Sequence, residues 1–229
     1  DAYGDRRRTK VTGPVEEIQF SAEVYIVAED GYTIVTKDGW VKRQKSYTDV
    51  SAIRVREEDE VRFIVPMSSR ETLVLFTDKG RAYSLRGADI GMTTGYGEAI
   101  QTKFDFADGE RIIGAATTDE RTLPLIDTAV LDELSPDDPM PPYVVIMTRG
   151  GKSARLSLQL FAEPSKRNGR LYARLDSAVP NDAVVGATIS RGNEFVSLAT
   201  RQGKCLLFPV GDVNVRGGAG KGVAAIKLS

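Results

Sequence analysis

The stretch from Val215 to Val223 reads VRGGAGKGV and contains four glycines and two basic residues. Glycine lets a backbone turn with positive φ and approach a ligand closely, while Arg and Lys supply charge for a phosphate. Such a stretch fits a phosphate cradle, a contact with a nucleic-acid backbone or a plain turn. It lacks the Gly-Lys-Ser/Thr ending of a nucleotide-binding P-loop, because Gly222 and Val223 follow Lys221. We therefore expect no ATP site here.

The residue types that drive most enzyme chemistry are scarce in this sequence. It contains no histidine and a single cysteine, Cys205, which excludes Ser-His-Asp and Cys-His catalysis, His-based metal sites and thiolate clusters. Carboxylate chemistry stays open, but no helix or loop gathers the acids around an obvious pocket. We therefore expect no catalytic residue, no bound metal and no cofactor in this chain.

Charged residues are strongly segregated along the chain, although the formal net charge is only −1. Residues 105–139 hold ten acids and two arginines, a net charge of −8, whereas residues 143–176 carry +5 and residues 191–229 carry +4. One interpretation is patchy surface charge that keeps a protein soluble. The other is a basic track for a polyanion, with the acids placed elsewhere.

These residues must be positioned by a scaffold, and the sequence indicates a repeated β-hairpin. Each copy is an apolar, β-branched run that ends in Thr, followed by two polar or turn-prone residues, a Gly and a second run. Apolar and β-branched residues favour strands, and Gly supplies the positive φ of a hairpin turn. The aligned threonines are Thr36, Thr77, Thr148 and Thr200, and the aligned glycines are Gly39, Gly80, Gly151 and Gly203.

Two further patterns recur between the hairpins. ERIIGAATT (Glu110–Thr118) and DAVVGATIS (Asp182–Ser190) share an acid, two aliphatic residues, Gly and Ala, and DEVRFIVPM (Asp59–Met67) is a looser copy. We interpret these segments as third strands. The long loops TTGYGEAIQTKF, SKRNGRLYARL and RGGAGKGVAAIKL each place glycine ahead of a strand-like run. Four-stranded units of roughly 40–50 residues are typical of propeller blades, and an ordinary β-sandwich is the alternative.

The repeat and the composition predict how the chain is organised. The predicted blades cover about 21–67, 68–118, 143–190 and 191–229. Residues 119–142 form an acidic, Pro-rich insertion in which DTAVLDEL either forms a short helix or is disordered. No apolar run approaches the ~20 residues that span a bilayer, the first residues do not resemble a signal peptide, and one cysteine fits a reducing compartment. We expect a cytoplasmic protein without membrane contact.

Several of these motifs together resemble a known family. They are the opening YGDRRRT (Tyr3–Thr9), the hairpins DGWVKR and KGRAYSLR, and the closing RGGAGKGVAAIKL. The whole chain is similar to the C-terminal domain of the A subunit of bacterial type IIA topoisomerases, DNA gyrase and topoisomerase IV. The resemblance implies an all-β fold, the β-pinwheel, in which at least four propeller-like, four-stranded blades exchange strands with their neighbours. Residues 1–20 would join a catalytic core to the pinwheel of residues 21–229.

The resemblance also implies a function. In this family the basic outer rim binds duplex DNA without reading its sequence and bends or wraps it for strand passage. The implied partners are duplex DNA, the remainder of the topoisomerase A subunit, and the ATPase subunit. The active-site tyrosine and the ATPase lie outside the similar region, so this domain alone would be a non-catalytic, monomeric, nucleoid-associated module. A propeller-like scaffold for protein partners, without DNA binding, is the alternative, motivated by the acidic insertion and the near-zero net charge.

A finer distinction within the family depends on one motif. Gyrase carries a box of Gln, two basic residues, Gly-Gly, a basic residue and Gly in its first blade, which is associated with negative supercoiling. The corresponding loop here, QKSYTDVSAIRVRE, has no Gly-Gly. The nearest match, NVRGGAG (Asn214–Gly220), lies in the fourth blade and keeps only one of the basic residues. The sequence therefore favours a topoisomerase IV-like role or a gyrase that wraps DNA weakly.

The predicted DNA contacts follow from the physics of wrapping. Affinity comes mainly from phosphate neutralisation and counterion release, and bending ~20–30 bp costs a few kcal/mol that many contacts must share. Each basic residue alone is either a DNA contact or an ordinary surface charge. The expected contacts are Arg6, Arg7, Arg8, Lys42, Arg43, Arg81, Arg86, Lys152, Arg155, Lys166, Arg167, Arg170, Arg174, Lys204, Arg216 and Lys221. Gly217, Gly218, Gly220 and Gly222 are expected to bring the backbone close to phosphates.

Overall fold

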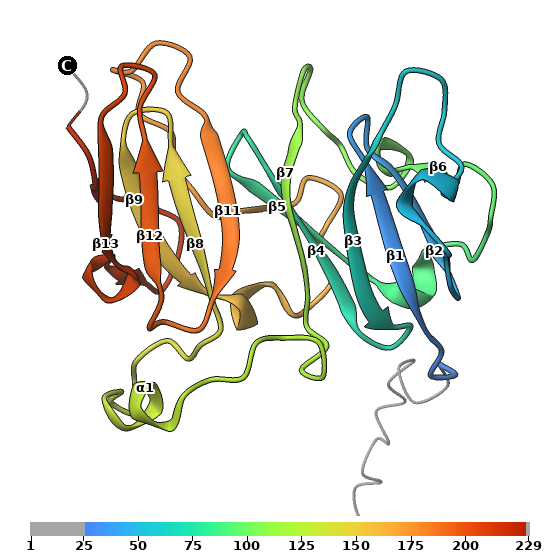
Figure 1. Cartoon of the computed structure of the whole chain (residues 1–229), viewed down its shortest axis with the longest axis horizontal. Coiled ribbons are helices and arrows are strands. Elements are labelled where there is room, and N and C mark those ends of the chain that lie inside the picture. Colours follow the sequence, from blue (N-terminus) through green and yellow to red (C-terminus); the bar gives the residue numbers. More distant parts are fainter. Residues whose placement is uncertain (1–25, 228–229) are drawn as a thin grey trace, which may run out of the picture.

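Four successive β-hairpins organise residues 26–227, the part of the chain that this computed structural model describes (Figure 1). The turn of each hairpin passes through one of the four aligned glycines, which have φ values of 75–83°. The predicted hairpins are therefore confirmed. Their strands are β1 (Asp30–Thr36) and β2 (Trp40–Gln44), β4 (Thr72–Thr77) and β5 (Arg81–Arg86), β8 (Tyr143–Thr148) and β9 (Lys152–Ser157), and β12 (Phe195–Ala199) and β13 (Cys205–Pro209).

A third strand adds to each of the first three hairpins. These strands are β3 (Val61–Ser68), β7 (Ile112–Thr117) and β11 (Val184–Ser190), and each pairs antiparallel with the first strand of its hairpin. The acid that precedes two of them closes the hairpin turn: an Asp59 oxygen accepts from the Asp38 N–H at 3.1 Å, and an Asp182 oxygen accepts from the Gly150 N–H at 3.0 Å. The recurring acid thus satisfies backbone donors that a turn leaves unpaired.

Short strands in the long loops cross from one sheet to the preceding one. The resulting sheet orders are β3-β1-β2-β6, β10-β5-β4-β7 and β11-β8-β9-β14, and β15 also pairs with β9. Each sheet therefore takes one of its two edge strands from the next repeat, and this strand covers an otherwise open edge of the hairpin. This strand exchange, within an all-β architecture, is the predicted pinwheel. The exchanged strands are β6 (Glu98–Ala99), β10 (Arg170–Leu171), β14 (Val215–Arg216) and β15 (Val223–Ala224).

The fourth hairpin differs from the other three. Within residues 26–227, β12 and β13 form a sheet of two strands, to which neither a third strand nor an exchanged strand adds. Phe195 and Leu207 on these strands are each 65% exposed. The fourth predicted blade is thus a hairpin in the described part of the chain, rather than a four-stranded sheet.

The hydrophobic core lies between successive sheets. Strand β4 is buried at all six positions, and because side chains alternate along a strand, it contributes to two clusters. Leu73 and Leu75 pack with residues of the first sheet such as Val35, whereas Val74 and Phe76 join a cluster with β8 and β9 of the third sheet. The sheets therefore stack on one another, and residues at the two edges of each sheet are available for other roles.

The remaining elements are short helices. Helix α1 (Thr128–Asp132) lies in the acidic insertion, below the sheets in Figure 1, and the Asp127 side chain caps it by accepting from the Ala129 N–H. A short helix therefore forms in part of DTAVLDEL. The 3₁₀ helices are η2 (Val50–Ala52), η3 (Gly87–Asp89), η4 (Ile100–Thr102), η5 (Leu158–Phe161) and η6 (Val210–Asp212).

Candidate nucleic-acid interface

The outer edge of the sheets is built by three segments that we call the exchange loops. They comprise residues 91–106, 162–176 and 214–226, and they contain the strands that pair with the preceding sheet. The sequence repeat in these loops predicts a shared backbone path. The structure shows that the path around one glycine is the same in all three, although the third loop contributes two strands to the preceding sheet and the others one each.

One glycine of each exchange loop lies directly on the preceding hairpin. Gly97, Gly169 and Gly222 have φ values of 87, 64 and 74°, in the left-handed region that favours glycine. A Cβ at Gly97 would lie 2.4 Å from the Val41 carbonyl oxygen, and equivalent contacts of 2.9 and 2.6 Å arise at the second and third loops. Both the turn and the close approach therefore require glycine.

A shared hydrogen bond fixes each exchange loop to the hairpin turn beneath it. The Ile100 N–H donates to the carbonyl of Gly39 at 2.9 Å, and the corresponding bonds to the carbonyls of Gly80 and Gly151 measure 2.8 and 2.9 Å. The donor lies three residues after the loop glycine in every case. The hairpin glycines thus form the turn, and their carbonyls also accept a hydrogen bond from the exchange loop. Each exchange loop is therefore attached at the equivalent position of its hairpin.

Neighbouring exchange loops are joined through their backbones. The Asp105 N–H donates to the Arg167 carbonyl at 2.8 Å, which connects the first loop to the second. The Arg174 N–H donates to the Gly220 carbonyl at 2.9 Å, and Ala173 forms a parallel bridge with Gly220. The three loops therefore form a continuous outer rim across the sheets.

The rim is basic over the second and third sheets but not over the first. Residues 162–176 contain four cations and two carboxylates, a net charge of +2, and residues 214–226 contain two cations and no acid. Residues 91–106 contain one cation and two acids, a net charge of −1. A polyanion that follows this rim would therefore meet favourable charge from the second sheet onward.

Three predicted contacts on the second exchange loop are well placed for a polyanion. Lys166, Arg170 and Arg174 are exposed, and none of the carboxylates in residues 26–227 pairs with them. Arg167 is also exposed, but its guanidinium binds the Asp105 carboxylate at 2.9 Å. An exposed pair of this kind contributes little energy, so Arg167 can exchange its partner for a phosphate at small cost.

Two predicted contacts of the third sheet share one carboxylate. The Nζ atoms of Lys152 and Lys221 lie 2.5 and 3.3 Å from oxygens of Asp176. The hydrogen bond from Lys152 is the largest of the effects that hold the pKa of Asp176 well below its usual value, followed by the Ala178 N–H and Lys221. These lysines therefore tie the second exchange loop to the third sheet, in addition to adding charge to the rim.

Lys42 and Arg43 are buried instead of lying on the rim. They are 1% and 3% exposed. The Lys42 ammonium donates to the carbonyls of Arg54 and Gly95 at 2.6 and 2.7 Å, and the Arg43 guanidinium donates to the Glu29 carbonyl at 2.6 Å. Burial lowers the pKa of both groups. Because both groups are buried and donate to backbone carbonyls inside the protein, we remove these two residues from the candidate interface.

Three further predicted contacts are partly buried and hold loops in place. Arg81 donates to the Asn168 carbonyl at 2.7 Å, and Arg155 donates to the Val213 carbonyl at 2.6 Å. Arg86 lies 3.6 Å from the Glu163 carboxylate. Arg81 and Arg86 connect a hairpin to the second exchange loop, and Arg155 connects β9 to the residue just before the third, so all three position the rim.

The glycine-rich stretch from Val215 to Val223 lies on the third exchange loop. Arg216 is partly buried, and its side chain packs against Gly220, where an added Cβ would lie 3.2 Å from an Arg216 nitrogen. Gly217 and Gly218 are exposed, with no neighbouring atom within 4 Å of an added Cβ. Gly222 is the docking glycine described above. Backbone accessible to a phosphate is thus available at Gly217 and Gly218.

The other predicted contacts lie on the fourth hairpin or outside the described residues. Lys204 is exposed on the turn of the fourth hairpin, to which no exchange loop docks within residues 26–227. Arg6, Arg7 and Arg8 lie outside the described residues.

Two exposed arginines near the first sheet were not predicted. Arg54 lies over the Tyr96 ring at 4.6 Å from its centroid, and Arg56 lies over the Trp40 ring at the same distance. Cation–π stacking of this kind holds a guanidinium in place while leaving its charge accessible. Sequence spacing gives no signal for these pairs, because the loop of residues 45–58 folds back on its own sheet and against the first exchange loop to form them.

Among residues 26–227, no group of three or more His, Cys, Asp or Glu side chains could hold a metal ion. None of the helices in that range is long and apolar enough to cross a membrane.

Comparison with known proteins connects this architecture to a family. The family model described as DNA gyrase C-terminal domain, beta-propeller, matches residues 71–119, 142–190 and 194–229, which is more than half of the chain. The chain belongs to this family. Each matched stretch of the gyrase C-terminal domain starts at or just before a hairpin, and the first two run through an exchange loop to a third strand. The family repeat therefore spans two neighbouring sheets.

Individual relatives of this gyrase-type domain agree with the family match. The A subunit of DNA gyrase from Dehalogenimonas lykanthroporepellens is 29% identical over 99% of this chain, and the A subunit of DNA topoisomerase 4 from Bacillus subtilis is 24% identical over 99% of it. The crystal structure of the C-terminal domain of DNA topoisomerase IV superposes with a TM-score of 0.71 at 21% identity, covering 89% of this chain and 59% of that one. The chain spans about a quarter of the length of the curated relatives it matches.

Proposed function

We propose that this chain binds duplex DNA without sequence preference along its outer rim, and that it bends or wraps the duplex there. The observation that carries the proposal is the continuous, backbone-joined row of exchange loops, in which Lys166, Arg170 and Arg174 have no carboxylate partner among the described residues. A row of separated cations suits DNA because backbone phosphates form a line of fixed negative charges. Contacts of this kind position a duplex but carry no base information.

We further propose the place of this domain in a larger enzyme. It acts as the C-terminal domain of a type IIA topoisomerase A subunit, in the cytoplasm and on the nucleoid, and it presents DNA for strand passage. It is itself a monomeric, non-catalytic module without a cofactor. Its protein partners are the remainder of the A subunit, which supplies the active-site tyrosine, and the ATPase subunit, which supplies ATP hydrolysis. Family membership supports this assignment.

The first-sheet loop supports a topoisomerase IV-like role or a weakly wrapping gyrase. Residues 45–58 lack Gly-Gly. They are anchored to their own sheet by the Arg56–Trp40 stack and the bond from Lys42 to the Arg54 carbonyl, and to the first exchange loop by the Arg54–Tyr96 stack. The adjoining first exchange loop has a net charge of −1. This part of the rim therefore offers less attraction to DNA than the second and third sheets, which limits the length of duplex that the domain bends.

The rim proposal is tested by removing two of its uncompensated charges. Arg170→Gln with Arg174→Gln should weaken binding of a 30–40 bp duplex about ten-fold at about 0.1 M salt, and should reduce the slope of log K against log salt by about 2, because two phosphate contacts are lost. Fluorescence anisotropy across a salt series measures both quantities.

A matched control removes the same charge elsewhere. Arg62→Gln with Arg149→Gln alters two exposed arginines near the opposite, inner edge of the sheets, and it should change duplex affinity less than three-fold. Equal losses in both double variants would show that net charge, not the rim, governs binding. Wild-type protein that fails to bind duplex at low salt would favour the alternative, a scaffold for protein partners.

A further inference from the structure

The inner strands of the three sheets carry the same irregularity at the same place. In each inner strand the register skips one residue, next to the residue that pairs with the threonine at the end of the first hairpin strand. The skipped residues are Arg62 in β3, Ile113 in β7 and Val185 in β11. A β-bulge of this kind redirects the side chain of the extra residue. All three bulged residues line one pocket of about 270 Å³. The repeat thus converges on this pocket from three successive sheets.

The pocket is lined by aliphatic and cationic side chains. Its apolar lining includes Ile112, Ala183 and Val184 in addition to the two aliphatic bulge residues. Its other lining residues are the cations Lys37, Arg62, Arg111 and Arg149. The inner strands lie at the opposite edge of each sheet from the exchanged strands, so this pocket is separate from the rim.

The repeat shows which of these charges are compensated. In all three sheets, the residue after the hairpin threonine donates its backbone N–H to the carbonyl of the residue just before the bulged strand, at 2.8–2.9 Å. In the first sheet this pair is Lys37 with Glu60, 3.9 Å apart, and in the second it is Asp78 with Arg111, 3.2 Å apart. Two of the four cations in the pocket therefore have a carboxylate close by.

The third sheet breaks this pattern. There Arg149 stands opposite Ala183, and the partner carboxylate is absent from that position. The Arg149 guanidinium instead donates to the Asn181 carbonyl at 2.8 Å, which orients the group without neutralising it. Arg62 occupies a bulge position that is aliphatic in the other two sheets, and no carboxylate within residues 26–227 pairs with it. Two uncompensated guanidinium groups therefore line one small pocket.

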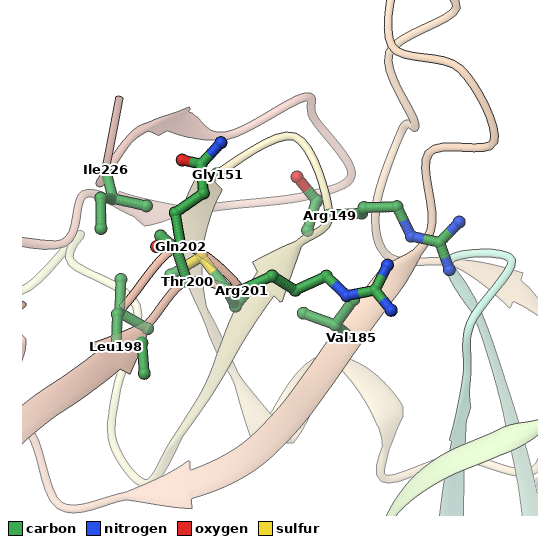
Figure 2. A pocket seen from close by; sticks show the side chains of 11 residues that line it. Arg149, Gly151, Val185, Leu198, Thr200, Arg201, Gln202 and Ile226 are labelled. Atoms are coloured by element: carbon green, nitrogen blue, oxygen red, sulfur yellow. The ribbon is translucent and has the colours of Figure 1, made fainter. Parts of the chain in front are cut away.

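An adjoining pocket adds a third guanidinium. It has a volume of about 760 Å³, shares Arg149 and Val185 with the first pocket, and includes Arg201. Arg201 follows Thr200 as Arg149 follows Thr148. Figure 2 shows Arg149 and Arg201 extending in the same direction past Val185. The positive charge of the inner pocket is therefore reinforced by the fourth hairpin.

We propose that this inner pocket binds a compact polyphosphate, the chemistry shared by inorganic tripolyphosphate and the triphosphate of a nucleotide. Guanidinium groups bind phosphate oxygens with paired, charge-assisted hydrogen bonds, and Arg62 and Arg149 are both exposed and so accessible to an anion from solvent. The cations converge on a volume below the range of drug-sized sites, whereas a duplex requires charges spread along a line. The arrangement thus favours a small anion over DNA.

Binding is measured on the full 229-residue chain by isothermal titration calorimetry at about 0.1 M salt, where charges more than ~10 Å apart are screened. Tripolyphosphate and ATP, without added divalent cations, are the two probes. We expect saturable binding of one tripolyphosphate per chain. Arg62→Gln with Arg149→Gln should weaken it at least ten-fold. ATP binding several-fold more tightly than tripolyphosphate identifies a nucleotide as the source, and equal affinity identifies an inorganic polyphosphate.

The rim variant serves as the matched control. Arg170→Gln with Arg174→Gln removes the same charge and should leave tripolyphosphate affinity within two-fold of wild type. The proposal is overturned by a lack of saturable binding, by equal losses in the two double variants, or by a loss of duplex affinity in the inner-pocket variant as large as that in the rim variant. Far-UV circular dichroism and thermal melting verify that both variants are folded.

Discussion

Among single residues, the glycines of the exchange loops have a role that the sequence only partly reveals. Their recurrence shows that a special backbone conformation is needed. The structure adds that each lies against the carbonyl of an equivalent hairpin residue, so that a side chain would collide with backbone as well as strain φ. Backbone cannot move aside as a flexible side chain can. The strand exchange therefore depends on these three positions.

A substitution at one of these glycines should destabilise the protein. Gly169→Ala places a methyl group 2.7 Å from the Tyr83 ring at a φ of 64°, and we expect a loss of about 1–3 kcal/mol in the free energy of unfolding. Equilibrium denaturation in urea measures the change. Gly217→Ala is the control, because nothing lies within 4 Å of its added Cβ, and it should shift stability by less than about 1 kcal/mol. Similar losses in the two variants would contradict the docking role.

Among the elements, Asp176 of the second exchange loop connects that loop to the third sheet and to the third exchange loop. It accepts from Lys152 of β9, from Lys221 and from the Ala178 N–H. A single carboxylate therefore joins three segments that are distant in the sequence. Two of the basic residues predicted for DNA binding are thereby shown to have a structural task as well.

This junction should make stability depend on pH. Hydrogen bonds hold the pKa of Asp176 below its ordinary value of 3.8, so its contribution is fully present above that value and is lost as pH falls towards the folded-state pKa. Asp176→Asn should therefore lower the melting temperature at pH 7, and the gap from wild type should narrow between about pH 5 and pH 2. Thermal melts across this range test it. Asp108→Asn, an exposed acid without a partner among the described residues, should show no such convergence.

Across the whole molecule, stacking the sheets separates two basic surfaces. The exchanged strands place one row of charge along the outer rim, while the bulges of the inner strands gather a second set at the inner pocket. The rim is extended and the pocket is confined. Different anions should therefore distinguish the two surfaces, even though the net charge of the chain is only −1.

The topoisomerase IV-like proposal makes a prediction for the complete enzyme. An enzyme carrying this domain should relax and decatenate DNA in the presence of ATP without introducing negative supercoils, because the first-sheet loop and its exchange loop extend the basic rim little. Gel analysis of plasmid topology, with the domain present and deleted, provides the measurement. Efficient negative supercoiling that depends on the domain would instead identify a gyrase.

The hairpins, the third strands and the loop segments that pair with them could be predicted from the sequence, because their signals are local. Thr, two turn residues and Gly define each hairpin over a few positions, and runs of aliphatic residues define the strands between them. The family resemblance added the strand exchange, and the pairing of β6, β10, β14 and β15 with preceding sheets confirmed it. The fourth blade departs from the repeat, since it is a two-stranded hairpin in the described residues.

Which charges face solvent depends instead on packing between segments that are distant in the sequence. Lys42 and Arg43 lie on the return strand after a hairpin glycine, as Arg81 does, yet both are buried, because a folded-back loop covers one face of β2 and the second repeat covers the other. The bulge that places Arg62 in the same pocket as Arg149 is likewise invisible in the repeat, since it depends on the register between strands. Strand alternation sets which side chains share a face. Long-range packing then determines whether that face meets water, another sheet or a ligand.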